Sequence, residues 1–403
     1  MKKTSLCQRF PLQKTYLLFL YLLTFSCATE DNIHPPIEKS FQEIFDIILL
    51  YSRETKISPD IFRYDWEDGV YVNSIIRLYK SGIDTINNLN YLKQIGDLSL
   101  NKANGAIPNQ MIPGVVFPFL YEELNDQRYL VAAEKIYNDY KNIPKSKNGA
   151  TSHTINEVQL WDDTIYMTGT FLLQMFEMSG DTIYLQDYIK EISGHYEHLN
   201  DPNEHLWYHA WDEDGIDNRS FQTGSVDGWT SIDDKNSDEF WARGNGWVLM
   251  GICDILPHIP TTHPNYPFLV DVYFNMLYSL SLYQDNITGH WFNIINKANY
   301  TRNFIESSST MMYAYSILSL INSGTINSSK WLLDVVDDSY NGLQQISIKN
   351  EGDLWLITNV CGGSSVGNQE YYFNRPIVSN TNFSLGLFLM YSAEVLKYHK
   401  TRF

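Results

Sequence analysis

The sequence repeats a helix-pair pattern, and this feature limits the fold more than any other. The segment 120–136 (LYEELNDQRYLVAAEKI) is similar to the segment 175–192 (MFEMSGDTIYLQDYIKEI). Asp126, which follows one apolar run, corresponds to Asp181, 55 residues later. We expect each Asp to cap the helix that follows it, and a period of this length fits one helix hairpin with its loops. Because a single hairpin cannot bury its apolar face, the repeat predicts hairpins that stack on one another.

Apolar residues at helical spacing fill most of the chain and predict about twelve helices. These are expected near 38–53, 66–80, 87–101, 113–123, 127–142, 162–178, 182–196, 242–256, 266–284, 306–322, 328–347 and 382–397. Strand signals are confined to 289–296 and 347–358. Six hairpins predict an all-α fold, an (α/α)6 barrel with inner and outer helices around a pocket at one end. An open solenoid is the alternative, and the unequal loops argue against it. We expect the long polar loop at about 197–240 to be functional.

The N-terminus is typical of a secretion signal. Its first 14 residues carry Lys2, Lys3, Arg9 and Lys14 and no acidic residue. An apolar run of about 14 residues follows, which is too short for a stable membrane span. Small residues at Ser26 and Ala28 fit a cleavage site. We therefore expect a signal segment at 1–28, a single domain at 29–403 and a secreted protein. A lipid anchor on Cys27 is the alternative.

The composition limits the kinds of partner. The formal net charge of −18 argues against nucleic acid, and an anionic ligand would need local cations to offset the long-range repulsion. Aromatic residues make up 14% of the chain, enough to line a sugar-binding groove, although many such side chains fill cores. Cys253 and Cys361 are the cysteines of the mature chain, and the sequence leaves their pairing open. Glycosylation sequons stand at Asn286, Asn299, Asn327 and Asn382.

The stretch DEFWARGNGWVLMGICDILP (238–257) combines glycines, tryptophans and one cation at the start of a helix. Gly244 and Gly246 permit close approach to the backbone, and the first turn of a helix favours an anion. Arg243 supplies a forked cation suited to a carboxylate, and Trp241 and Trp247 would form walls. This interpretation predicts a pocket for a negatively charged ring. The alternative is a packed helix start in which Arg243 makes a structural ion pair.

Two further stretches carry candidate chemistry. In EVQLWDDTIYM (157–167), one of Asp162 and Asp163 can cap a helix while the other points elsewhere. A carboxyl beside Trp161 loses hydration, so its pKa rises and it can act as a general acid. In EHLWYHAWDEDG (204–215), His209 lies four residues after His205, but the Glu of a His-Glu-x-x-His zinc motif is missing. We therefore expect no metal site.

These motifs together resemble the unsaturated glucuronyl and rhamnogalacturonyl hydrolases, glycoside hydrolase families 88 and 105. The similarity rests on WARGNGW, on Trp161-x-Asp163 followed by Tyr166-Met167, and on LWYHAWD. The segments MIPGVVFPFLYEELNDQRYL and NVCGGSSVGNQEYY also look like family segments, so the resemblance covers most of residues 66–397. It implies a ring of six helix hairpins.

The resemblance also implies a reaction that needs no metal and no cofactor. The substrate would be an anionic oligosaccharide, a polysaccharide-lyase product that ends in a 4,5-unsaturated uronic acid. An Asp protonates C4, water adds at C5, and the hemiketal collapses to release the next sugar. By position, Asp163 matches the catalytic acid/base and His209 a histidine near the reacting ring. Substrate-binding roles fall to His153, Trp161, Trp241, Arg243 and Trp247.

One position departs from the family pattern. Asn109 stands where the family has a second pocket Asp, and an amide cannot carry a charge or act as a base. Either Asp163 performs both proton transfers, or activity is weakened. Two alternatives therefore stay open beside the hydrolase: a sugar-binding protein that has lost catalysis, and a mannanase-like helical-ring glycosidase that uses the Asp162-Asp163 pair.

Overall fold

The computed structural model describes residues 39–215, 229–230 and 235–402. The expected signal segment 1–28, with Cys27, lies outside the described residues, as does part of the loop at 197–240. Residues Ser40–Phe403 form one compact unit, and the account below concerns that unit.

The described unit is built from helices that alternate between two layers. The inner layer contains α2 (Trp66–Lys80), α5 (Val116–Leu124), α7 (Asp163–Ser179), α9 (Ala242–Ile255), α11 (Ser307–Asn322) and α14 (Asn382–Arg402). The outer layer contains α1 (Phe41–Tyr51), α3 (Thr85–Ser99), α6 (Gln127–Lys141), α8 (Ile183–Leu199), α10 (Tyr266–Leu282) and α12 (Lys330–Gly342). All twelve expected helices are confirmed, and 66–80 matches α2 at both ends.

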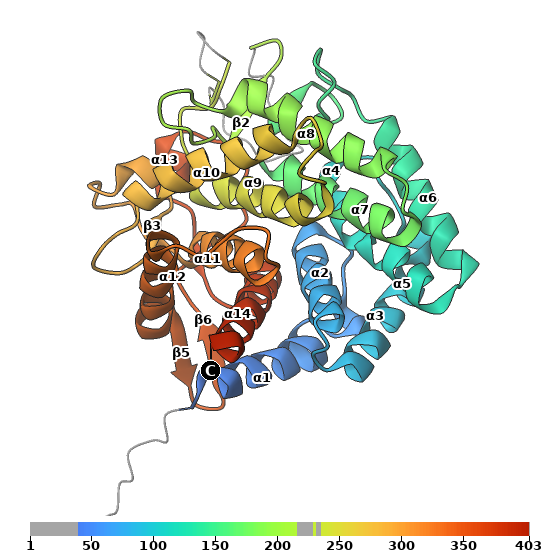
Figure 1. Ribbon diagram of the computed structural model, residues 1–403, viewed down its shortest axis with the longest axis horizontal. Coiled ribbons are helices and arrows are strands. Elements are labelled where there is room, and N and C mark those ends of the chain that lie inside the picture. Colours follow the sequence, from blue (N-terminus) through green and yellow to red (C-terminus); the bar gives the residue numbers. More distant parts are fainter. Residues whose placement is uncertain (1–38, 216–228, 231–234, 403) are drawn as a thin grey trace, which may run out of the picture. The chain divides into compact units, whose positions relative to one another are not determined.

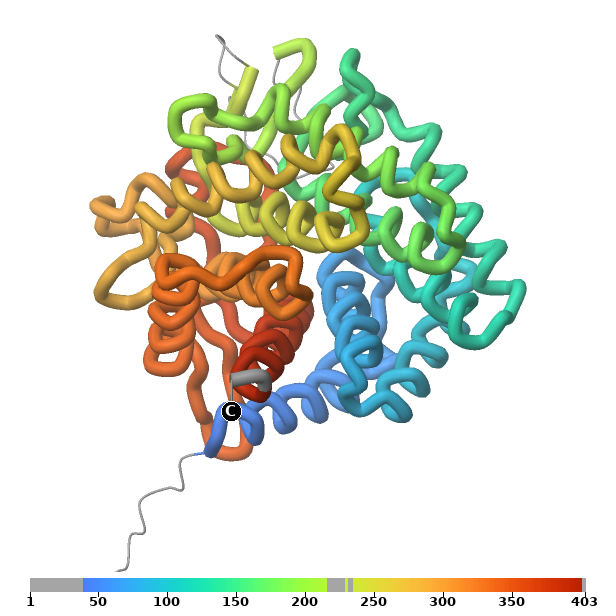
Figure 2. Tube along the Cα trace, in the orientation of Figure 1, coloured from blue at the N-terminus to red at the C-terminus, as the bar shows by residue number. Residues whose placement is uncertain are grey.

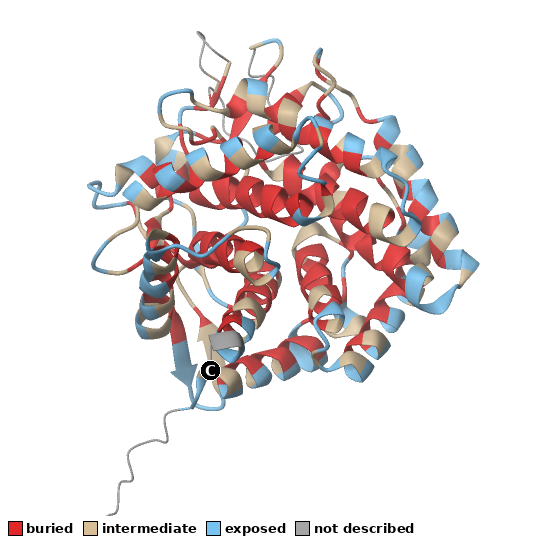
Figure 3. Cartoon of the chain, in the orientation of Figure 1, coloured by how far each residue is buried: buried red, intermediate tan, exposed pale blue. Residues whose placement is uncertain are grey.

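Burial explains the two layers. Every residue of α9 is buried, and all but three residues of α11 are buried. Outer helices such as α6 and α12 instead bury one face and expose the other. Figure 3 shows this contrast as continuous red on α9 and mixed colours on outer helices such as α6. A helix that is apolar on all sides must be surrounded by protein, so the sequence of each helix sets its layer.

The inner helices close into a ring. α2 packs against α5 and the turn Ile112–Val115 before it, and the contacts continue through α7, α9, α11 and α14. α14, near the end of the chain, then packs against α2 and α1 (Figures 1 and 2). This closure rules out the open solenoid and confirms the (α/α)6 barrel.

Short strands and helices occupy the loops. The antiparallel pairs are β1 (Gln159–Trp161) with β2 (Ala210–Asp212), β3 (Trp291–Phe292) with β4 (Ile305–Glu306), β5 (Ile348–Glu351) with β6 (Leu354–Ile357), and β7 (Val360–Cys361) with β8 (Ile377–Val378). The strand character of 347–358 and 289–296 is therefore confirmed. The sequence did not predict α4 (Pro108–Met111) or α13 (Gln369–Phe373), which are too short for periodicity to detect.

Both repeated aspartates accept a backbone hydrogen bond at a helix start, but only Asp126 is the N-cap residue, since the N-cap of α8 is Thr182. The Asp126 carboxylate accepts a hydrogen bond from Arg128 N at 3.0 Å, and Asp181 accepts one from Ile183 N at 3.0 Å.

Cys253 and Cys361 are both buried and free, so they do not pair. Among the described residues, no helix has the length and apolarity needed to cross a membrane.

Candidate active site

A pocket opens where inner helices α2, α7 and α9 begin. It holds about 1090 Å³ of space, part of it open to solvent. Its lining comprises Trp66, Glu67, Ile107, Asn109, His153, Trp161, Asp163, Trp241, Arg243, Gly363, Ser364, Ser365, Tyr371 and Arg375. Six of the predicted site residues are therefore brought together: Asn109, His153, Trp161, Asp163, Trp241 and Arg243.

The pairing of β1 with β2 brings the central side chains together. Trp161 lies opposite Ala210, and Asp162 N donates to His209 O at 3.0 Å. The residues just outside the pair, Asp163 after β1 and His209 before β2, are thereby neighbours. Asp163 and His209 are 46 positions apart in the sequence, and the pairing of β1 with β2 brings them into contact in the fold.

A directed chain of hydrogen bonds runs through His209. Its Nε2 lies 3.1 Å from Asp163 Oδ2, and its Nδ1 lies 2.5 Å from the Tyr372 hydroxyl. Because an ionised carboxylate can only accept, Nε2 carries the hydrogen that lies between His209 and Asp163. Gly367 N donates to the Tyr372 hydroxyl at 3.3 Å. The chain fixes the orientation of a buried histidine beside the carboxylate.

The electrostatics of Asp163 correct one expectation from the sequence. Burial alone would raise the pKa of the Asp163 carboxyl, but the hydrogen bond and attraction of His209 outweigh burial and lower it. The side chain is 14% exposed and faces the pocket. The contacts of Asp163 therefore favour its carboxylate form, whereas the sequence led us to expect a raised pKa.

Asp162 also differs from expectation. Its side chain is fully buried, at the N-cap position of α7, but it makes no capping hydrogen bond. The expectation that one aspartate of the pair caps this helix is therefore wrong. Burial, and then the neighbouring Asp163, raise its pKa well above the ordinary value. Since Asp162 does not line the pocket, an enzyme that needs both carboxylates of the pair against its substrate does not fit this site.

His153 and Trp161 form one wall of the pocket. Their rings stack with centroids 4.4 Å apart and planes 2° apart. His153 Nδ1 lies 2.9 Å from Thr164 Oγ1, and burial lowers the pKa of His153 to about 4. The imidazole is thus neutral near pH 7. Asn109, on α4, is half-buried in the same pocket.

Arg243 is held by the protein itself. It is fully buried, its two terminal nitrogens donate to Cys361 O at 2.7 Å and Gly362 O at 2.8 Å, and Glu306 lies 3.8 Å away. The guanidinium also lies 4.6 Å from the ring centroid of Trp241. These contacts fit the structural ion pair that the sequence left as the alternative. They do not fit a cation free to bind a carboxylate.

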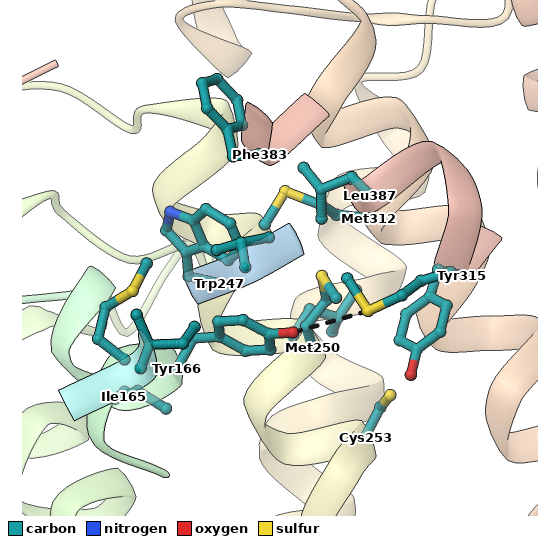
Figure 4. Close-up of a cluster of buried hydrophobic side chains, with 14 of the residues drawn as sticks. Ile165, Tyr166, Trp247, Met250, Cys253, Met312, Tyr315, Phe383 and Leu387 are labelled. Carbon is teal, nitrogen blue, oxygen red and sulfur yellow. Dashed lines mark hydrogen bonds between the residues drawn. The ribbon is translucent and has the colours of Figure 1, made fainter. Parts of the chain in front are cut away.

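The glycines of the WARGNGW stretch make room for side chains from other helices. A Cβ on Gly244 would lie 2.0 Å from Asp162 Oδ2, and a Cβ on Gly246 would lie 2.7 Å from Met312 Cε. Trp247 is buried in the core and stacks on Tyr166 with centroids 4.9 Å apart (Figure 4). It does not line the pocket, so its prediction as a substrate-binding residue is wrong.

Sequence reasoning missed several pocket residues. Arg375 is half-buried, lies 4.8 Å from the ring centroid of Tyr371, and has an Nε with no partner. Ser364 and Ser365 also line the pocket. Glu67 adds a second carboxyl, whose pKa is raised chiefly by burial. The segment 359–372 was noted only as family-like, and no residue in it was given a role.

Groups of both signs meet at the pocket end of the ring, since the carboxyls of Asp163 and Glu67 line the pocket beside positive charge. Each helix N-terminus carries about half a positive charge, and α2, α7 and α9 begin at the pocket. Arg375 and Arg243 add two cations.

In the described chain, Asp162, Asp163 and His209 also offer ligand atoms within 4.8 Å of one another, a spacing that a metal ion could occupy. His205 is not part of that group.

The sequence of this chain is similar to those of known proteins. The family model described as Glycosyl Hydrolase Family 88 matches residues 47–399. The unsaturated rhamnogalacturonyl hydrolase YesR of Bacillus subtilis (strain 168) is 26% identical over 351 residues, covering 84% of this chain and 91% of the relative. An unsaturated 3S-rhamnoglycuronyl hydrolase of Formosa agariphila is 20% identical over 341 residues, covering 83% and 84%.

Solved structures show the same fold. A family 105 glycoside hydrolase of C. acetobutylicum ATCC 824 superimposes with a TM-score of 0.75 at 22% identity, covering 87% of this chain and 98% of the other. An unsaturated glucuronyl hydrolase specific for heparin gives a TM-score of 0.66 at 13% identity, covering 89% and 97%.

Proposed function

This chain belongs to glycosyl hydrolase family 88, and from that premise we propose that it hydrolyses oligosaccharides ending in a 4,5-unsaturated uronic acid. The observation that carries the proposal is the Tyr372–His209–Asp163 chain, which places one oriented carboxylate in an aromatic pocket. Two relatives are named as hydrolases of unsaturated rhamnogalacturonyl and rhamnoglycuronyl substrates, which supports the same class of substrate for this chain. Both names also point to rhamnose as the next sugar.

The chemistry follows from a single reacting carboxyl. The vinyl ether of the substrate takes a proton at C4, which leaves positive charge at C5 and the ring oxygen. Water then adds at C5 and gives up a proton, and the resulting hemiketal collapses to release the next sugar. Asp163 transfers protons at these steps, and His209 holds its carboxylate in place. The stacked rings of His153 and Trp161 exclude water from one side.

The uronate carboxylate requires a cation that is free to bind it. Arg375 meets that requirement better than Arg243, because its side chain is half-buried at the pocket whereas that of Arg243 is fully buried. Arg375 donates to one backbone carbonyl, that of Gly363, whereas Arg243 donates to two. Ser364 and Ser365 also line the pocket. We assign the part of the pocket around Arg375 to the carboxylate.

The test is loss of the ultraviolet absorbance of the conjugated uronate when the protein is mixed with a panel of lyase digests. Decay of absorbance with at least one digest supports the proposal, and the responding digest identifies the uronide and linkage. Binding of lyase products without decay would favour the sugar-binding protein that Asn109 suggests. Cleavage of saturated oligosaccharides alone would favour an ordinary glycosidase.

We also propose that the protein is exported and glycosylated. The basic and apolar segment at 1–28 supports export. The sequons at Asn286, Asn299 and Asn327 are exposed, whereas Asn382 begins α14 and donates to Asp68. N-terminal sequencing of the protein recovered outside the cells tests cleavage after Ala28. Retention in the membrane that is abolished by Cys27→Ser would instead indicate the lipid anchor.

A further inference from the structure

Glu67 is a pocket carboxyl that the proposed chemistry leaves without a role. It lies in the first turn of α2, where an acidic residue also stabilises the helix, so a role in binding needs evidence from the pocket itself. Its side chain is 25% exposed, and its Oε2 lies 3.5 Å from Nη2 of the exposed Arg63. The side chain of Asp163 is only 14% exposed. These exposures place Glu67 nearer the mouth of the pocket than Asp163.

Glu67 borders the part of the pocket that we assign to the uronate. A Cβ on Gly363 would lie 3.8 Å from Oε1 of Glu67 and 3.8 Å from Cζ2 of Trp66. Arg375 donates to the carbonyl of the same glycine. Glu67 on α2 and Arg375 after α13 therefore approach Gly363 from different elements, and a ligand held by Arg375 is bordered by Glu67.

The charges of the pocket lining suit one anionic group and no more. Four charged side chains line the pocket in the described part of the chain: Glu67, Asp163, Arg243 and Arg375. Arg243 is fully buried and gives both terminal nitrogens to backbone carbonyls, which leaves Arg375 for the uronate. Once the uronate is bound, the charged groups that still face the ligand are the carboxyls of Glu67 and Asp163. A second anion on the substrate would be repelled by both.

Arg63 does not relieve this repulsion. Its Nε lies 3.1 Å from Asp65 Oδ2, and its Nη2 lies 3.4 Å from Asp68 Oδ1 and 3.5 Å from Glu67 Oε2. The guanidinium is thus shared among three carboxylates. Arg63 is also not part of the pocket lining.

The direction of the substrate brings its second sugar toward Glu67. The reacting uronate is the end of the oligosaccharide, so it occupies the enclosed part of the pocket beside Asp163, and the next sugar extends toward the mouth. The pocket space of about 1090 Å³ is large enough for a ligand of more than one sugar ring. A hydroxyl of the second sugar would donate a charge-assisted hydrogen bond to the Glu67 carboxylate. A sulfate ester or a carboxylate on that sugar would meet a like charge.

We propose that Glu67 determines specificity for the sugar next to the unsaturated uronate. It binds the hydroxyls of an uncharged sugar and excludes a sugar that carries a sulfate ester or a carboxylate. One side chain thus supplies attraction for one class of substrate and repulsion for the other. The inference rests on the proposed function, and within it selects the unsaturated uronides whose neighbouring sugar is neutral.

The first test compares two disaccharides that end in the same unsaturated uronate and differ by one sulfate ester on the second sugar. Loss of ultraviolet absorbance gives kcat/KM for each. We expect the wild-type protein to prefer the uncharged disaccharide by about 10-fold or more, because like charges within one pocket are screened poorly. Glu67→Gln keeps the shape of the side chain and removes its charge. It should raise kcat/KM for the sulfated disaccharide and reduce the preference by about 10-fold.

Glu370→Gln is the matched control. Glu370 lies on α13, is exposed, pairs with Arg302 at 2.8 Å and does not line the pocket. The variant removes the same charge outside the pocket, so it should keep the wild-type preference. Equal kcat/KM for the two disaccharides in the wild-type protein overturns the proposal. An unaltered preference in Glu67→Gln overturns it too, as does an equal reduction in Glu370→Gln.

The second test needs no variant. Raising NaCl from about 0.05 M to about 0.5 M shortens the range of electrostatic repulsion, and the wild-type preference should shrink several-fold. The effect of salt on the uronate is common to both disaccharides, so it cancels in the ratio. A preference that salt leaves unchanged would show exclusion by shape and would overturn the role of charge. Equal decay of both disaccharides refutes the role of Glu67 alone, whereas failure to consume any lyase product refutes the proposed function.

Discussion

Replacing Arg243 tests whether this cation holds the protein or the substrate. Arg243→Met removes the hydrogen bonds to Cys361 O and Gly362 O and leaves Glu306 without its nearby charge. A hydrogen bond from a charged group contributes about 1.5–3 kcal/mol, and removing one partner of a buried ion pair costs about 3–5 kcal/mol. We therefore expect the free energy of unfolding to fall by about 3–5 kcal/mol.

The assay is urea denaturation at fixed pH, read by tryptophan fluorescence, with equal m values required for the comparison. Arg375→Gln is the matched control, since Arg375 lines the same pocket but is only half-buried and donates to a single backbone carbonyl, that of Gly363. It should raise KM by about 10-fold or more, the loss of one charged hydrogen bond, with little change in stability. The opposite pattern, a stable Arg243→Met with raised KM and an unaffected Arg375→Gln, would refute the reasoning.

Three further outcomes are expected. Tyr372→Phe removes the hydroxyl that orients His209, so kcat should fall while KM stays nearly constant, and an unchanged kcat would show that the chain is not needed. Asn109→Asp adds a like charge to the pocket of Asp163, so the acid limb of the kcat profile should move to higher pH; no shift would place the two groups out of electrostatic reach. Burial lowers the pKa of His153 from 6.5 to about 4, so the unfolded chain binds more protons in this range. The free energy of unfolding should therefore fall as pH drops from 6.5 to 4, by about 3 kcal/mol at most from this group, and a flat or rising stability in urea titrations over that window would contradict the neutral, buried imidazole.

The sequence predicted the helices because periodicity is a local property of each segment. The helix at 66–80 appears as α2 at the same boundaries, since its apolar spacing and the cap at Asp65 lie within one stretch. Asp163 was placed in the pocket by the family resemblance, through the Trp161-x-Asp163 register, and it lines the pocket.

Contacts between distant segments were beyond such reasoning. Gly244 was interpreted as a site of approach for a ligand, whereas it admits the Asp162 carboxyl from another helix. Trp247 shares a motif with Trp241 but turns into the core, because a helix places successive residues on different sides. Tyr372 lies in the short helix α13, and Arg375 lies in the irregular segment that follows it. Neither segment is long enough for periodicity to indicate which side chains point inward.

The central claim is that this protein adds water to a double bond instead of attacking the anomeric carbon. The most direct measurement uses an unsaturated uronide with sulfur in place of the glycosidic oxygen, a bond that resists ordinary glycosidase attack but leaves the vinyl ether intact. The account predicts that the ultraviolet absorbance of this substrate decays at a rate comparable to that of the oxygen glycoside, and that Asp163→Asn abolishes the decay. A protein that consumes the oxygen glycoside but leaves the sulfur analogue untouched would contradict the account.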